Sequence, residues 1–268
     1  MPSMATASPP TAARSATKTI LRLAPLLLAA QAAAQDPATR AASLCSKMTA
    51  AEISGLMAGT GWGKAKYVGF AHGVPRLGVP DLHLNDGPQG FRCNGLGKCP
   101  GGTSTQYPSG LTIAATWSED SALAWGTAMG KEFYGKGANV QLGPGLCLAR
   151  VPQNGRNFEY MSGEDPLLGN QLAPGAITGI QGQGVVANAK HYILNNQETQ
   201  RNSVDVQIDE RTLFEMYLPP FAGAIDAGVG SVMCSYNKIG GRWSCEHNQT
   251  LNTDLRDRLG NLTTYVLL

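Results

Sequence analysis

The sequence predicts an α/β fold, a (β/α) TIM-type barrel, and three observations lead to that prediction. Short apolar segments alternate with segments of helical periodicity along most of the chain, which is typical of parallel βαβ units. Polar residues repeatedly follow the strand segments, as active-site residues do at one rim of a (β/α) barrel. No Gly-x-Gly-x-x-Gly motif follows a strand, which argues against the alternative of a doubly wound open sheet.

Residues 1–34 are predicted to be a secretory signal peptide. Three basic residues precede an apolar run over 23–34, and this run ends in small residues suited to cleavage. The run is shorter than the roughly 20 residues that a membrane-spanning helix needs. An apolar helix that stays attached and a transit peptide are the alternatives. We therefore expect a secreted, extracellular protein whose folded domain spans residues 35–268.

Composition narrows the classes of partner. The chain has 33 glycines and only 15% charged residues, a balance that suits a loop-rich surface binding neutral polar ligands. Removal of residues 1–34 would take away three positive charges and no negative one, which turns the net charge of +2 slightly negative. No basic patch then remains, so we expect neither nucleic acid nor a membrane as a partner. No motif indicates a cofactor, and no Cys/His spacing indicates zinc.

Capping signals justify the helices in chain order. Asp-Pro pairs at 36–37 and 165–166 place an N-cap before a proline at the first helical position. Ser118 and Asp209 are N-caps of two further helices, the second interrupted by Pro219-Pro220, and leucines at helical spacing mark the last one. The predicted helices cover approximately 36–57, 118–135, 165–180, 209–227 and 251–259.

Short apolar runs bounded by glycine or proline justify the strands. They cover 82–84, 138–142, 185–187, 231–234 and 264–268.

Polar residues follow four of these strands: Asp86, Arg156 on the loop after the second strand, Lys190 with His191, and Tyr236. Each has a plainer interpretation when taken alone. Asp86-Gly87 is ordinary turn chemistry, and Lys190 could lie on a loop that Glu198 and Arg201 stabilise through ion pairs. Their recurrence at strand ends favours a common site at one rim of the barrel.

The six cysteines form an even set in a chain that is predicted to be secreted, so disulfides are expected. Cys93 and Cys99 form one locally close pair. Cys234 and Cys245 form the other, and we expect a disulfide between them across a Gly-Gly turn. Cys45 and Cys147 remain, either bridged or free. Asn248 and Asn261 begin Asn-x-Thr sequences and are glycosylation acceptors if the chain is secreted.

Taken together, these segments resemble the N-terminal domain of glycoside hydrolase family 3, the β-glucosidase-like group. The resemblance extends from about Cys45 to Gly260, with several motifs in family order and at family-like spacing. The motifs are Lys47-Met48-Thr49 with Gly59-Thr60-Gly61-Trp62, Asn85 to Arg92, Gly155-Arg156-Asn157-Phe158-Glu159, Lys190-His191-Tyr192, Arg211-Thr212-Leu213, and Gly230 to Asn237.

The resemblance implies a site that holds a terminal sugar. Its binding residues would be Asp86, Arg156, Lys190 and His191, with Met233 and Tyr236 forming a wall and a polar contact beside the nucleophile. Arg201 would orient the Lys190–His191 segment or contact a second sugar unit. The sequence His191-Tyr192-Ile193 is similar to the glucosidase branch rather than the N-acetylglucosaminidase branch.

The resemblance assigns no catalytic residue within this sequence. A retaining glycosidase needs two carboxyl groups about 5–5.5 Å apart. The family's nucleophile is the aspartate of a Ser-Asp-Trp motif, expected just beyond Leu268, and its acid/base usually comes from a second domain. Asp86, Glu159 and Glu198 are carboxylates without an implied catalytic role. We therefore expect an incomplete barrel and an inactive chain.

The expected function is that of a hydrolase chain whose complete relative removes terminal non-reducing β-D-glucosyl residues from β-linked glucosides or oligosaccharides by a retaining mechanism. One alternative is a secreted sugar-binding or vestigial protein without catalysis. Another makes Lys190 a Schiff-base nucleophile in an aldolase-like barrel.

Overall fold

The computed structural model of the chain describes residues 36–60, 66–93, 99–260 and 265–267, which fall into two compact units that divide between Thr49 and Ala50. The first unit contributes helix α2 (Pro37–Cys45), whose N-cap Asp36 accepts a hydrogen bond from the Thr39 N–H at 3.0 Å. Every helix of the described residues is too short or too polar to cross a membrane.

The helix predicted over 36–57 is wrong in its continuity. It is two helices, α2 and α3 (Ala50–Met57), separated by a turn. The N–H groups of Lys47 and Met48 bond carbonyls three residues back, so the backbone tightens and leaves the α-helical path. The Ser46 hydroxyl donates to the Ser43 carbonyl, and this side-chain bond competes with continuation of the helix.

The second unit is built on a six-stranded sheet with the order β1-β2-β3-β4-β6-β9. Strands β2, β3, β4, β6 and β9 pair in parallel, each with its neighbour in that order, as the sequence predicted. Strand β1 pairs antiparallel with β2 at the edge and was not predicted. The sheet strands are β1 (Gly69–Ala71), β2 (Leu82–Asn85), β3 (Val140–Gln141), β4 (Val186–Tyr192), β6 (Ser231–Cys234) and β9 (Tyr265–Leu267).

The remaining elements of this unit connect the strands. They are η1 (Pro75–Leu77), α4 (Gly110–Ala114), α5 (Glu119–Gly135), η2 (Asn157–Glu159), α6 (Pro166–Gln181), α7 (Glu210–Thr212), η3 (Leu213–Tyr217), α8 (Pro219–Asp226), η4 (Ser244–Glu246) and η5 (Gln249–Arg258). A small second sheet, β5 (Asp205–Val206), β7 (Lys238–Ile239) and β8 (Arg242–Trp243), was not predicted.

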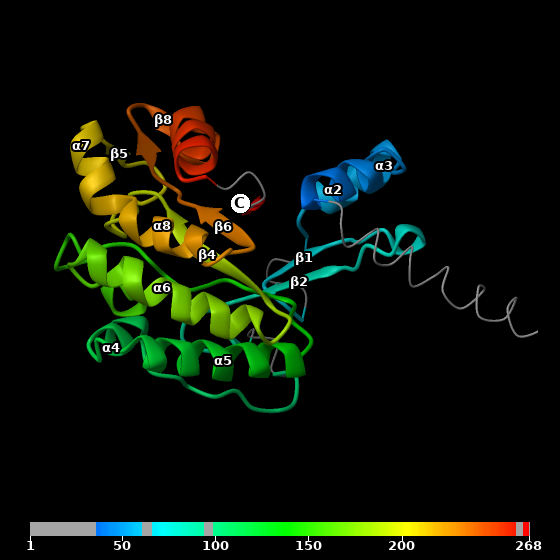
Figure 1. Cartoon of the computed structure of the whole chain (residues 1–268), viewed down its shortest axis with the longest axis horizontal. Helices are drawn as coiled ribbons and strands as arrows, with labels where there is room; N and C mark the ends of the chain where they lie inside the picture. Colours follow the sequence, from blue (N-terminus) through cyan, green and yellow to red (C-terminus); the bar gives the residue numbers. More distant parts are fainter. Residues whose placement is uncertain (1–35, 61–65, 94–98, 261–264, 268) are drawn as a thin grey trace, which may run out of the picture. The chain divides into compact units, whose positions relative to one another are not determined.

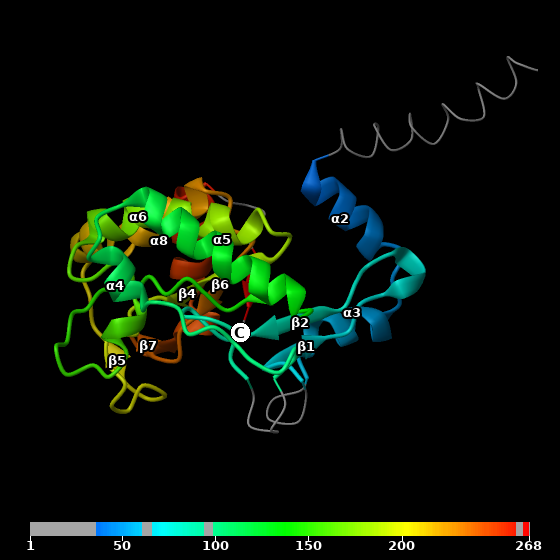
Figure 2. The same cartoon turned by 90° about the horizontal axis from the view of Figure 1, so that it is seen from below.

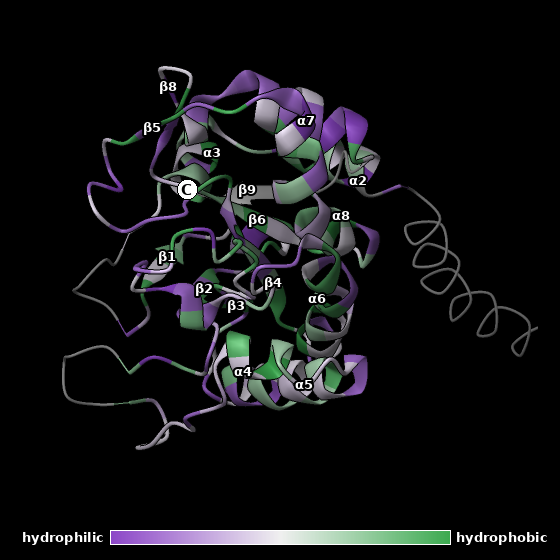
Figure 3. Cartoon of the chain, turned by 90° about the vertical axis from the view of Figure 1, so that its left-hand side faces the viewer, coloured by the Kyte–Doolittle hydropathy of each residue, from purple (hydrophilic) through white to green (hydrophobic). Residues whose placement is uncertain are grey.

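Helices α5, α6 and α8 lie along one face of the sheet (Figures 1 and 3). Helices α5 and α6 run side by side, also when seen from below (Figure 2). Their close approach depends on Gly126, since a Cβ there would lie 2.3 Å from the Ala176 carbonyl oxygen. Apolar side chains from these helices and from Ala187, Ala189 and Val232 of the sheet form the main core.

The opposite face of the sheet carries a smaller apolar cluster of Val68, Val140 and Leu142, with Val186 and Met233 packed against it. Because side chains alternate along a strand, Val186 and Lys190 share this face while Ala187 and Ala189 face the helices. Parallel strands with helices on one face and an enclosed apolar cluster on the other form the incomplete wall of a TIM-like barrel.

Strand β4 is longer than the predicted 185–187. It continues to Tyr192, with a register shift against β6 between Lys190 and Tyr192. Lys190 and His191 therefore belong to the carboxyl-terminal end of the strand rather than to the loop beyond it. The strand was predicted from its apolar run, so the prediction stopped where polar residues begin. Polar side chains can continue a buried strand when they find hydrogen-bond or ion-pair partners.

Candidate functional site

Asp86 and Lys190 meet at the carboxyl ends of two strands of the sheet. The Lys190 Nζ lies 3.3 Å from Asp86 Oδ1, and a guanidinium nitrogen of Arg92 lies 3.3 Å from Asp86 Oδ2. The Lys190 side chain is only 4% exposed, whereas the Asp86 side chain is 22% exposed. The carboxylate thus compensates a buried ammonium group and still faces the surface, where a ligand can reach it.

The turn that presents Asp86 is fixed by the buried side chain of Asn85. Its amide oxygen accepts a hydrogen bond from the Val68 N–H, and its amide nitrogen donates to the carbonyls of Asp86 and Arg92. The Arg92 N–H also donates to the Asp86 carbonyl at 2.6 Å. The carboxylate therefore leaves the end of β2 in a set direction.

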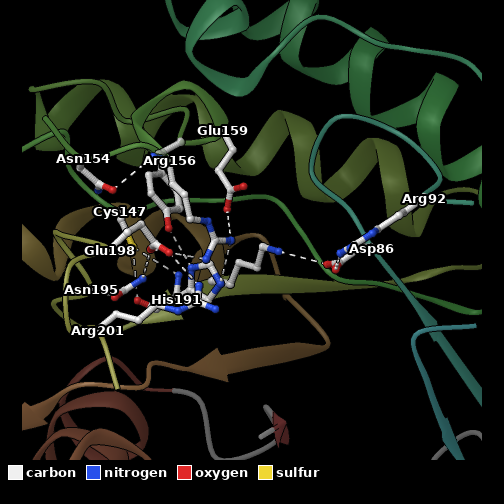
Figure 4. Close-up of polar contacts among 12 residues, drawn as sticks. Asp86, Arg92, Cys147, Asn154, Arg156, Glu159, His191, Asn195, Glu198 and Arg201 are labelled. Carbon is white, nitrogen blue, oxygen red and sulfur yellow. Dashed lines mark hydrogen bonds and ion pairs between the residues drawn. The ribbon is translucent and has the colours of Figure 1, made fainter. Parts of the chain in front are cut away.

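Arg156 connects the loop after β3 to the end of β4 (Figure 4). One of its terminal nitrogens lies 2.5 Å from Glu159 Oε1 and 3.4 Å from His191 Nε2, and the other lies 3.7 Å from Glu198 Oε1. The loop reaches β4 through Gly145, which forms isolated β-bridges with both Tyr160 and Lys190. Main-chain pairing thus sets Arg156 beside His191.

His191 is almost completely buried, with 4% of its surface exposed. Its ring Nδ1 lies 3.0 Å from the Tyr160 hydroxyl, and its backbone N–H donates to Cys147 Sγ at 3.4 Å. Burial holds the pKa of this imidazole well below its usual value, and the positive charges of Lys190, Arg156 and Arg201 lower it further. His191 is therefore neutral at physiological pH.

Glu198 joins the cluster to the loop that follows β4. Its carboxylate accepts from Arg201 at 2.8 Å and from the Asn195 amide at 3.3 Å, in addition to the contact with Arg156. The Arg201 guanidinium lies 4.8 Å from the centre of the Tyr236 ring, a cation–π contact. This contact links Tyr236, on the loop after β6, to the other polar residues.

Met233 and the disulfide lie next to this cluster on β6. Met233 is in register with Lys190 on β4, is half-buried, and packs against the inner apolar cluster. The disulfide joins Cys234 to Cys245 with a Cα–Cα distance of 5.2 Å, and it holds the loop carrying Tyr236 against η4. The expected pairing is thus present in the structure.

The structure therefore brings all seven predicted binding residues into one connected region. Asp86 contacts Lys190, and the chain of contacts from His191 through Arg156, Glu198 and Arg201 ends at Tyr236; Met233 lies beside Lys190 on the neighbouring strand.

The ion pair expected between Glu198 and Arg201 is present, and Glu159 pairs with Arg156 at the same spacing of three residues. Tyr160 and Cys147 also hold this cluster together but were not predicted. Their contacts with His191 span 31 and 44 residues, so no spacing in the sequence signals them.

The other predicted features are the remaining cysteines, the glycosylation acceptors and the signal peptide, and some of them lie outside the described residues. Cys93 and Cys99 form a second disulfide, whereas Cys45 is free and exposed and Cys147 is free and buried. Asn248 is exposed just before η5. The predicted signal peptide, residues 1–34, and Asn261 lie outside the described residues.

The rest of the described chain holds weaker candidates for a functional site. No group of three or more His, Cys, Asp or Glu side chains suited to a metal ion occurs within the described parts of the chain. Two surface hollows lie away from the cluster. One of about 500 Å³ runs along α3 past Ile53 and Met57, and one of about 380 Å³ lies between Phe214 and Arg258.

Comparison with known proteins gives a consistent result. Residues 92–263 match the model of the glycosyl hydrolase family 3 N-terminal domain. Beta-glucosidase A of Aspergillus kawachii is 44% identical over 235 residues, which cover 82% of this chain and 26% of that protein. Beta-glucosidase 1 of Aspergillus aculeatus is 43% identical over the same shares of the two chains.

Two solved structures share the fold. The beta-glucosidase DesR of Streptomyces venezuelae, in complex with D-glucose, superimposes with a TM-score of 0.78 at 37% identity, over 85% of this chain and 28% of that one. Beta-glucosidase 3B of Thermotoga neapolitana, in complex with glucose, gives 0.78 at 36% identity, over 84% and 33%. The chain spans about a quarter to a third of the length of these relatives. On the family match, the sequence identity and the shared barrel, the chain belongs to glycosyl hydrolase family 3.

Proposed function

We propose that the cluster around Asp86 and Lys190 binds the terminal non-reducing β-D-glucosyl unit of β-linked glucosides or oligosaccharides. The observation that carries the proposal is the meeting of a partly exposed carboxylate with a lysine, an arginine and a neutral histidine at the carboxyl ends of parallel strands. A carboxylate accepts hydrogen bonds from adjacent sugar hydroxyls, while ammonium and guanidinium groups donate to others. The glucose complexes of two similar enzymes support this choice of ligand.

Each binding residue has a proposed part. Asp86 and Lys190 bind hydroxyls of the terminal glucosyl unit, and Arg156 and His191 bind others from the opposite side. Buried groups of this kind discriminate between epimers, because a hydroxyl in the wrong orientation leaves them unpaired. Met233 and Tyr236 form the wall beside the reacting carbon, and Arg201 supports Tyr236 through the cation–π contact.

We propose further that the reaction of the complete protein is hydrolysis with retention of configuration, and that residues 35–268 alone bind the sugar without turning it over. Asp86, Glu159 and Glu198 are each engaged in ion pairs, and the family resemblance gives none of them the role of nucleophile or acid. The proposed nucleophile is an aspartate following Leu268. General acid catalysis alone contributes ~10²–10⁴-fold, so a polypeptide without either group has little activity left.

The remaining assignments are also proposals. Residues 1–34 act as a secretory signal, the protein is extracellular, and residues 35–268 form one partial barrel domain. Asn248 carries an N-linked glycan, which its exposure permits. Nucleic acids and membranes are not partners.

Calorimetry with D-glucose tests the binding proposal. Asp86→Asn keeps an acceptor for Lys190 but removes the charge that sugar hydroxyls donate to, so affinity should fall about tenfold to hundredfold, as expected for a hydrogen bond to a charged group. Asp226→Asn is the matched control, since Asp226 is exposed at the end of α8. Equal affinity of the wild type and Asp86→Asn would contradict the assignment.

Turnover of an aryl β-glucoside separates the proposed enzyme from the alternative of a sugar-binding protein. The 35–268 polypeptide should bind glucose and release almost no aglycone. The same polypeptide extended by the residues that follow in a complete relative should hydrolyse the glucoside. Turnover by residues 35–268 that Asp86→Asn abolishes would mean that a carboxylate already present serves as nucleophile.

A further inference from the structure

The groups around His191 determine where its ring carries a proton. On the Nε2 side, the contact at 3.4 Å is with a guanidinium nitrogen of Arg156. A guanidinium group has only donors, so a hydrogen bond between them requires an unprotonated Nε2 with its lone pair directed at Arg156. A neutral imidazole with an unprotonated Nε2 carries its proton on Nδ1.

The Nδ1 side of the ring supplies the matching acceptor. The Tyr160 hydroxyl oxygen lies 3.0 Å from Nδ1, and the two rings meet edge to face at an interplanar angle of 87°. Tyr160 is completely buried, so its oxygen has few competing donors. The Nδ1–H therefore donates to Tyr160.

The buried thiol of Cys147 lies beside the main chain of His191. Cys147 accepts from the His191 backbone N–H and donates to the His191 carbonyl, both at 3.4 Å. Burial raises the pKa of this thiol to about 11, so it stays protonated and can fill the donor role. The protons on Cys147 Sγ and on His191 Nδ1 then each have a defined acceptor.

Burial and the charges around the ring disfavour the imidazolium form. Lys190, Arg156 and Arg201 are the charged groups whose fields act on His191, and all three are positive. Glu159 and Glu198 are paired with Arg156, and Glu198 is also paired with Arg201.

We propose that Tyr160 is a positioning residue that holds His191 as the neutral Nδ1–H tautomer, so that Nε2 presents a lone pair to the sugar site. A hydroxyl of the bound glucosyl unit then replaces Arg156 as the donor to this lone pair, because Nε2 has only one. The hydrogen bond from the sugar rests on the proposed function, whereas the tautomer of His191 does not. The tautomer can be measured by NMR, because the chain has four histidines and therefore few ring signals.

Long-range ¹H–¹⁵N NMR of the ¹⁵N-histidine-labelled 35–268 polypeptide measures the tautomer directly. The His191 signals are assigned by their loss in His191→Gln. We expect a protonated Nδ1 and an unprotonated Nε2 at neutral pH without sugar. A protonated Nε2, or two protonated ring nitrogens, would overturn the inference.

Tyr160→Phe removes the hydroxyl that accepts the Nδ1–H and leaves the rest of the side chain unchanged in size and shape. We expect the Nδ1 proton to exchange faster with solvent and the Nδ1 resonance to move. Tyr192→Phe is the matched control, because Tyr192 is also completely buried and next to His191 in sequence, but its hydroxyl donates to the Thr250 carbonyl. His191 signals unchanged in Tyr160→Phe, or equally changed in both variants, would rule out the positioning role.

The direction of the sugar hydrogen bond is tested with monodeoxy and monofluoro analogues of D-glucose. Fluorine cannot donate a hydrogen bond. At the sugar position that meets His191, both analogues should therefore bind the wild type more weakly than glucose does. The His191→Ala variant should bind both analogues and glucose with equal affinity. A fluoro analogue that keeps the affinity of glucose where the deoxy analogue loses it would show His191 to be the donor. Failure of the wild type to bind D-glucose would overturn the proposed function and this hydrogen bond, while NMR still decides the tautomer.

Discussion

At the scale of the residue, the cluster is governed by which charges are buried. The Lys190 ammonium is almost fully enclosed and pairs with a carboxylate that is partly exposed and has a second partner, Arg92. The pair is therefore unsymmetrical. Loss of Asp86 strands a buried charge, whereas loss of Lys190 leaves a carboxylate that water and Arg92 still stabilise.

Two substitutions should express that asymmetry. Asp86→Ala is expected to lower the free energy of unfolding by about 3 kcal/mol, because a buried charge loses its partner. Lys190→Met, which keeps the length of the side chain, should cost about 1 kcal/mol or less. Urea denaturation of the two variants measures the difference. Equal losses would mean that the ammonium group is not buried as described.

His191 should make stability depend on pH in a defined direction. Its pKa in the folded chain lies well below the ordinary value of 6.5, mainly through burial, so the unfolded chain binds the extra proton first. The contribution of neutral His191 to the free energy of unfolding is therefore fully present above pH 6.5. It falls as the pH decreases below 6.5, by up to about 1.4 kcal/mol per pH unit.

Denaturation midpoints between pH 7 and pH 5 test this dependence. His191→Gln should remove most of the slope, whereas His247→Gln, at a position less buried and less shifted, should keep most of it. A slope that survives His191→Gln would assign the effect to other groups.

At the scale of the element, the loop after β3 is what brings Arg156 and Tyr160 to β4. Gly145 sits where that loop pairs with both Tyr160 and Lys190. A Cβ at this position would lie 2.7 Å from a ring carbon of Tyr160 and 2.9 Å from the Glu159 carbonyl oxygen. A backbone carbonyl cannot move aside as a flexible side chain can, so only glycine fits without displacing the loop.

Gly145→Ala should therefore destabilise the chain by about 1–3 kcal/mol and weaken glucose binding at the same time. Gly155→Ala, in the same loop, is the control, because a Cβ there would meet nothing within 4 Å. Thermal unfolding and calorimetry of the two variants provide the measurements. Wild-type behaviour of Gly145→Ala would show that the loop is not held against β4.

At the scale of the whole molecule, the signals that predicted the fold are local ones. Caps at Asp36, Ser118, Asp165 and Asp209 fix where helices begin, and each of these side chains accepts a hydrogen bond from the first turn. Alternation of strands and helices then limits the topology to parallel pairing. The strands of the second sheet escaped prediction because each has two residues, too few for a period to be seen.

The site was predicted less completely than the fold. Asp86, Lys190 and His191 follow from their positions at strand ends, but the residues that orient them do not. Tyr160 contacts His191 because two segments far apart in sequence pair through Gly145. Such a contact is a property of the packed chain, and no spacing in a single sequence encodes it.

The arrangement of the six cysteines gives a prediction for the whole chain. With two disulfides, an exposed Cys45 and a buried Cys147, a thiol reagent should label one cysteine in the native protein, two in denaturant and all six only after reduction. Mass spectrometry counts the labels. Native labelling of Cys147 would contradict its burial, and with it the enclosed environment of His191.

A crystal structure of residues 35–268 with D-glucose tests the central claim most directly. We expect the sugar to lie against Asp86, Lys190 and His191, with hydroxyls within hydrogen-bond distance of the Asp86 carboxylate and of His191 Nε2. Glucose bound elsewhere, or a cluster whose ion pairs remain intact while the sugar is absent at saturating concentration, would contradict it.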